Sequence, residues 1–260
     1  METRTENARR RESRARGTVG DALWLARRDI RSSWASFPAT AGVAFVFGLL
    51  AVAQYRNALV GETGVFGEAM LDFFLLALVA VMSANLLFNR DYFRTVSDES
   101  FNGRLSFLRS MPVSAKSVVY GRVASMLLAL ACAAPMFFLA PYLVYGELRE
   151  FVGFGGYVWY FGIWLGYAVL AVGGFVLCNF AFNWKLAEMW LPAAFAILGA
   201  YISIVLASNI LLENGLALSL MELAKTSGAM AALASILTGS AALAVCASIS
   251  AKRLERRDVG

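Results

Sequence analysis

The sequence contains no histidine. Without an imidazole, a Ser-His-Asp triad, a histidine metal site and a histidine proton relay are all excluded. Cysteine is scarce as well: Cys132, Cys178 and Cys246 each fall in a different apolar run, and none belongs to a Cys-x-x-Cys pair. Buried thiols that act as small apolar side chains explain this pattern better than a disulfide or a metal site does.

Motifs for chemistry are missing too. The chain has no GxxxxGK[ST] loop to hold nucleotide phosphates and no HExxH pair to hold zinc. Its apolar runs carry no carboxylates paired at catalytic spacing, and few ionisable groups of the kind that ion-coupled carriers use. We therefore expect that the chain is not an enzyme and holds no metal or cofactor of its own.

What the chain has in abundance is apolar sequence. Hydrophobic residues make up 59% of it, the mean hydropathy is +0.63, and the 16% of charged residues sit in short blocks. This composition predicts an all-α, polytopic membrane protein. Six runs reach the roughly 20 residues that a membrane helix needs. They lie at 38–56, 68–88, 117–141, 155–180, 188–211 and 227–250.

Positive charge is distributed unevenly between the runs. Nine lysines and arginines precede residue 38, six lie in 89–122, one is Lys185, and four lie in the C-terminal tail. The other three connections hold only Arg56, Arg149 and Lys225. Because cytoplasmic loops carry the excess of lysine and arginine, we expect both termini in the cytosol and six spans across the cell membrane.

The N-terminal region divides into two parts. Residues 1–20 are polar and arginine-rich, which predicts disorder. Residues 21–36 predict an amphipathic helix on the inner membrane surface, with large apolar residues on one face and arginines toward lipid phosphates. The residues in these roles are Trp24 and Trp34, and Arg27, Arg28 and Arg31. A soluble helix is the weaker alternative, because no soluble core is available to cover it.

The remaining chain, 21–252, reads as one six-span domain followed by a basic tail at 253–260. The apolar connection at 213–225 predicts a short helix on or in the outer leaflet, with an exposed loop as the alternative. Asp72 lies near the outer end of the second span, where we expect water to reach it and its role to be minor. Small residues recur at every fourth position in two spans, a spacing typical of close helix packing: Gly162 and Gly166, and Ala231, Ser235 and Gly239.

The longest polar break, 97–122, has an internal pattern of its own. Ser97 can cap a helix on which Phe101, Leu105 and Leu108 share one face. Pro112 ends this helix, and Ser114 can cap the next one, which enters the third span. The pattern allows two interpretations: a helix that docks onto a soluble partner, or a solvated loop with a surface helix.

This segment resembles the hallmark before the third span of type-2 ABC transporter permeases, the export-type membrane subunits of ATP-binding-cassette systems. The matching residues are Glu99, Gly103, Leu105, Leu108, Pro112, Ser114, Gly121 and Arg122. The predicted six-span layout, the N-terminal helix and the apolar 213–225 connection match as well, so the resemblance covers about residues 20–252. Arg104 departs from the small or hydroxyl residue more usual at this position.

The resemblance implies a permease subunit of an ABC exporter, with a cytosolic coupling helix between the second and third spans. It implies two partners: a separate ATPase subunit, which binds the ATP and magnesium, and a second permease subunit, alike or different. The ATPase-coupling residues would be Glu99, Phe101, Gly103, Arg104, Leu105 and Leu108. Membrane lipids are expected contacts and nucleic acid is not. Two alternatives stay open: a membrane enzyme acting on lipids, and an anchor that recruits a cytosolic protein.

Overall fold

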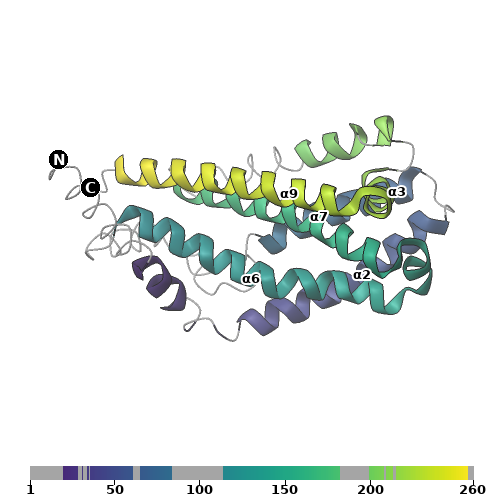
Figure 1. Cartoon of the computed structure of the whole chain (residues 1–260), viewed down its shortest axis with the longest axis horizontal. Helices are drawn as coiled ribbons and strands as arrows, with labels where there is room; N and C mark the ends of the chain where they lie inside the picture. The colour runs from purple at the N-terminus through teal and green to yellow at the C-terminus, as the bar shows by residue number, and fades with distance from the viewer. Residues whose placement is uncertain are drawn as a thin grey trace.

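A computed structural model shows how the chain folds. It describes residues 20–28, 31, 34, 36–60, 65–83, 114–181, 199–207, 209–212 and 215–256. Every regular element within these ranges is an α-helix, which confirms the predicted all-α class. The long helices lie lengthwise beside one another in an elongated bundle (Figure 1).

Five long helices form the bundle in the part of the chain that the structure describes. They are α2 (Ser36–Val60), α3 (Val65–Ser83), α6 (Ala115–Val144), α7 (Gly146–Ala181) and α9 (Gly215–Arg256). Four stretches within them are long and apolar enough to cross a membrane: Phe37–Val60, Ala115–Val144, Gly146–Cys178 and Gly215–Arg256. These match the predicted first, third, fourth and sixth spans. Helix α3 overlaps the predicted second span. Two shorter helices lie at 20–28 and Gly199–Leu211, and the second of these falls inside the predicted fifth span.

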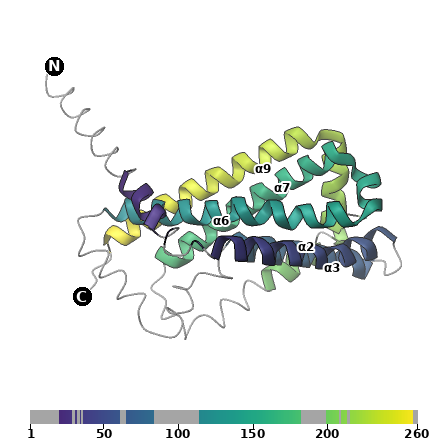
Figure 2. The same cartoon turned by 90° about the horizontal axis from the view of Figure 1, so that it is seen from below.

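The bundle has two distinct ends, visible in both views (Figures 1 and 2). One holds helix 20–28, the start of α6 and the last turns of α9; we call it the Gly121 end. The opposite end holds the α2–α3 and α6–α7 connections and the start of α9; we call it the Asp72 end. Helices α2, α3, α6 and α7 therefore alternate in direction, while α9 runs parallel to α7.

Helices α7 and α9 pack almost backbone to backbone. A Cβ on Gly162 would lie 2.9 Å from Ala232 Cβ, and one on Gly166 would overlap Ser235, whose Oγ donates a 2.8 Å hydrogen bond to the Ile163 carbonyl. A Cβ on Gly239 of α9 would overlap the Gly166 carbonyl oxygen of α7. The small-residue faces predicted in the fourth and sixth spans thus meet each other, because only small side chains let two helix backbones approach this closely.

Helices α2 and α6 form a second close pair. A Cβ on Gly48 would overlap the Phe137 carbonyl oxygen and would come within 2.8 Å of Ala140 Cβ. Helix α6 continues through Pro135 and Pro141 and ends at Val144. The bundle is therefore built from two tight helix pairs, α2–α6 and α7–α9, with α3 packed against them.

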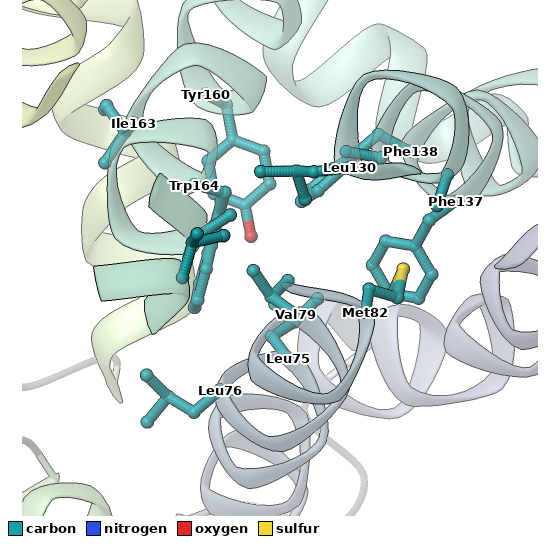
Figure 3. Packing of buried hydrophobic residues seen from close by; sticks show 14 of the residues in the cluster. Leu75, Leu76, Val79, Met82, Leu130, Phe137, Phe138, Tyr160, Ile163 and Trp164 are labelled. Atoms are coloured by element: carbon teal, nitrogen blue, oxygen red, sulfur yellow. The ribbon is translucent and has the colours of Figure 1, made fainter. Parts of the chain in front are cut away.

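Tyrosines of α7 connect the two pairs. Tyr160 contributes a buried hydroxyl 3.3 Å from that of Tyr55 on α2, and its ring lies among Leu130, Phe138 and Val79 (Figure 3). Tyr157 donates a 2.7 Å hydrogen bond to the Phe138 carbonyl of α6. On the next turns of the same face, Tyr167 donates to the Leu76 carbonyl of α3 at 3.1 Å. These bonds satisfy hydroxyls that would otherwise be costly to bury.

Candidate functional site

The predicted coupling residues lie outside the part of the chain that the structure describes. They are Glu99, Phe101, Gly103, Arg104, Leu105 and Leu108, all between Ser83, the last residue of α3, and Ser114. The described structure does include both elements that the prediction places beside them: the start of α6 and the N-terminal helix.

Helix α6 begins as predicted. Ser114 has an extended backbone, and its Oγ accepts a 3.1 Å hydrogen bond from the Ser117 amide. The Ser114 and Ser117 hydroxyls also lie 2.8 Å apart, and the Val118 amide donates to the Ser114 carbonyl. A serine N-cap stabilises a helix start by satisfying one of its free amides. The point where the 97–113 segment joins the bundle is therefore well defined.

Helix 20–28 packs directly on α6. Ala22, Leu25 and Ala26 are buried, and Leu25 Cβ lies 3.0 Å from where a Gly121 Cβ would stand. The Ala22 carbonyl oxygen is 3.1 Å from the same point. The N-terminal helix therefore packs against α6 at Gly121, where the missing side chain leaves room for it. The described helix at 20–28 lies within the region where an N-terminal helix was predicted, but its protein-facing side was missed. The spacing of Ala22, Leu25 and Ala26 on one helical face was the available signal.

Of the residues predicted to meet lipid, Trp24, Arg27 and Arg28 lie on the opposite side of this helix, and Arg31 and Trp34 follow it in the chain. Trp24 is 53% exposed and Trp34 is 71% exposed. Arg27, Arg28 and Arg31 are also exposed, and the Arg28 guanidinium lies 5.9 Å from the centre of the Trp24 ring. Large apolar and cationic side chains thus remain available on the outer side, which is the arrangement of a helix lying at a membrane surface.

Charge separates between the two ends of the bundle. The cations on the described turns of the Gly121 end are Arg27, Arg28, Lys116, Arg122, Lys252, Arg253 and Arg256, beside the anions Asp21 and Glu255. The Asp72 end has Arg56, Arg149 and Lys225 against Glu68, Asp72, Glu147, Glu150 and Glu222. One end is therefore basic and the other acidic.

Asp72 is buried, contrary to our expectation from the sequence. Its side chain is 1% exposed, and its carboxylate accepts 2.7 Å hydrogen bonds from the backbone amides of Leu216 and Ala217. The Asn209 side-chain amide donates a longer bond of 3.4 Å. The expectation of a hydrated carboxylate is wrong, because the first turn of α9 folds over Asp72 and replaces water with its own amides.

A second polar contact orients the start of α7 at the same end. The Tyr145 hydroxyl donates a 2.7 Å hydrogen bond to Glu147 Oε2. Burial, and next the bond to Glu147, raise the pKa of Tyr145 to about 12, with Arg56 acting in the opposite direction. The phenol therefore stays protonated as a donor at neutral pH and ties the α6–α7 connection to the first turn of α7.

Comparison of the chain with protein-family models, with characterised proteins and with solved structures finds no match.

Proposed function

We propose that this chain is the membrane-spanning permease subunit of an ATP-binding-cassette exporter, in the cytoplasmic membrane. In this proposal the helices make six spans, with α3 as the second and Gly199–Leu211 within the fifth. The Gly121 end faces the cytosol, a separate ATPase subunit docks there, and a second permease subunit completes the path.

The main observation behind this proposal is the packing of helix 20–28 against Gly121 of α6. Gly121 lies seven residues beyond Ser114, which is about 10 Å along a helix axis. The N-terminal helix therefore packs near the start of α6, the end to which the predicted coupling segment is joined in the chain. A push on the segment at 97–110 would pass straight into α6, a helix of 30 residues that reaches the Asp72 end.

Charge supports the orientation. Cations at the Gly121 end suit the cytoplasmic side, where lysine and arginine accumulate, and the acidic Asp72 end suits the outside. The inner leaflet is itself anionic, so Arg27, Arg28 and Arg31 would add attraction between helix 20–28 and that membrane surface.

Cysteine labelling should confirm this topology. In a background whose native cysteines are replaced, Val60→Cys and Glu150→Cys should react with an impermeant maleimide on intact cells, because both positions are exposed at the Asp72 end. Lys252→Cys, exposed at the Gly121 end, should react only after permeabilisation. The reverse pattern would place the bundle upside down and would remove the proposed docking side from the cytosol.

ATP hydrolysis should require a second protein. The purified chain should turn over no ATP, since it has no nucleotide-binding loop. Co-expressed one at a time with the ATP-binding-cassette ATPases of its own genome, it should co-purify with one of them and support hydrolysis in lipid. The control is that ATPase with its P-loop lysine replaced. The proposal fails if none of these ATPases binds, or if the chain alone is active.

A further inference from the structure

The first segment of α9 is set apart from the rest of that helix. A break at Ser227, with φ −139° and ψ 33°, separates residues 215–226 from 228–256. The segment begins at Gly215, whose φ of 67° favours glycine. Figure 2 shows it running across the Asp72 end, crosswise to the long helices. The helix predicted in the 213–225 connection is thus present, and it covers one end of the bundle.

Asp72 holds the first turn of this segment. The leading amides of a helix have no acceptor within it, and a carboxylate beside them is favoured by the helix dipole. Here both carboxylate oxygens are used: Oδ2 by the Leu216 amide and Oδ1 by the Ala217 amide. Because the site is buried, removing the acceptor would leave these amides without water to replace it.

The other end of the segment is held by α7. The Lys225 ammonium lies 3.3 Å from the centre of the Phe151 ring. Phe151 belongs to residues 146–152, which a break at Gly153, with φ 68°, separates from the rest of α7. Beyond Ser227, Gly228 is packed tightly under Trp159, where an added Cβ would lie 2.5 Å from Trp159 Cβ. Residues 215–226 are thus held at both ends, and the chain that follows them is held separately by the packing of Gly228 against Trp159.

We infer that residues 215–226 form a hinged gate over the outer end of the bundle, and that Asp72 is the positioning residue that holds it shut. Release of the two amides from Asp72 and of Lys225 from Phe151 would let the segment swing about Ser227, while Gly228 stays fixed. The inference rests on the proposed function, because a gate has a purpose only if cargo leaves at this end.

Hydrogen exchange of the full chain in lipid nanodiscs tests the latch without any partner. Asp72→Asn keeps one carbonyl oxygen and turns the other acceptor into an NH2 donor, so at least one of the Leu216 and Ala217 amides should exchange about tenfold faster, the effect of losing a buried acceptor. Glu150→Gln, which removes an exposed carboxylate from the same end, should leave it unchanged. Lys225→Gln should speed exchange around 222–226 with the Asp72 cap intact, so the inference can still be tested if Asp72→Asn misfolds. Unchanged exchange in the Asp72 and Lys225 variants would overturn it.

The complex with the ATPase tests the gate itself. With the ATPase trapped by ATP, magnesium and vanadate, exchange over 215–226 should rise in the wild-type complex. In Asp72→Asn it should already be fast and respond little to nucleotide, a difference that a purely structural cap would not produce. If the complex hydrolyses ATP but 215–226 never responds, the gate is wrong and the proposed function stands. If no ATPase binds, the proposed function fails, and the gate fails with it.

Discussion

Gly166→Ala should lower the melting temperature of the purified protein by about 6–12 °C. The added Cβ would overlap Ser235, including its backbone, and a backbone cannot move aside by changing rotamer. Overpacking of this kind costs about 1–3 kcal/mol. We expect the upper end of that range, and about 3 kcal/mol corresponds to the stated shift for a chain near this size.

The matched control for this experiment is Gly174→Ala on the same helix. A Cβ at Gly174 would meet nothing within 4 Å, and alanine favours helix over glycine, so this variant should melt at or slightly above the wild-type temperature. Thermal unfolding in detergent, followed by size-exclusion fluorescence, compares the two. Equal melting temperatures for both variants would mean that α7 and α9 do not approach as closely as described.

Leu105→Asp should abolish association with the ATPase while leaving insertion into the membrane intact. Residue 105 lies in the predicted docking helix, outside every predicted span. Three apolar residues on one helical face need cover, and the acidic start of that helix disfavours the anionic inner leaflet, so a protein groove is the better site. Burying one leucine contributes roughly 1.5–3 kcal/mol, about 10- to 150-fold in affinity, before the cost of burying a charge is added.

Ser106→Asp is the control for this variant, because it introduces the same charge on the opposite face of the predicted helix. Both variants are co-purified with the ATPase from membranes and compared at equal permease amounts. Leu105→Asp should lose the ATPase, and Ser106→Asp should retain it. Full retention by Leu105→Asp would remove the coupling role from residues 97–110.

Local signals in the sequence predicted local structure well. A serine before an apolar run predicted the start of α6, and Ser114 does cap it. Small residues at every fourth position predicted close packing of two spans, and Gly166 and Ser235 do meet. In both cases the cause lies within one or two helical turns, so a pattern in the sequence is enough to reveal it.

The Asp72 contact could not be predicted in this way. The two backbone amides that it accepts from lie 144 and 145 residues away in the sequence. No pattern near Asp72 or near Leu216 predicts this pairing. The position of Asp72 about one turn inside a span suggested hydration, but burial was decided by a helix from the far end of the chain. The break at Gly153 was missed for a similar reason, since glycine also occurs in unbroken membrane helices. The break at Ser227, in contrast, falls where the sequence placed the boundary between the 213–225 helix and the sixth span.

The close fit of α7 to α9 also sets an order of events during synthesis. Helix α7 is complete at Ala181, but the partner for its glycine face is complete only at Arg256. At about 5–20 residues per second, the ribosome needs about 4–15 s to cover that interval. For those seconds the glycine face of the nascent α7 lacks its partner, whereas α2 and α6 have already been made. The chain therefore assembles its first helix pair before the second becomes possible.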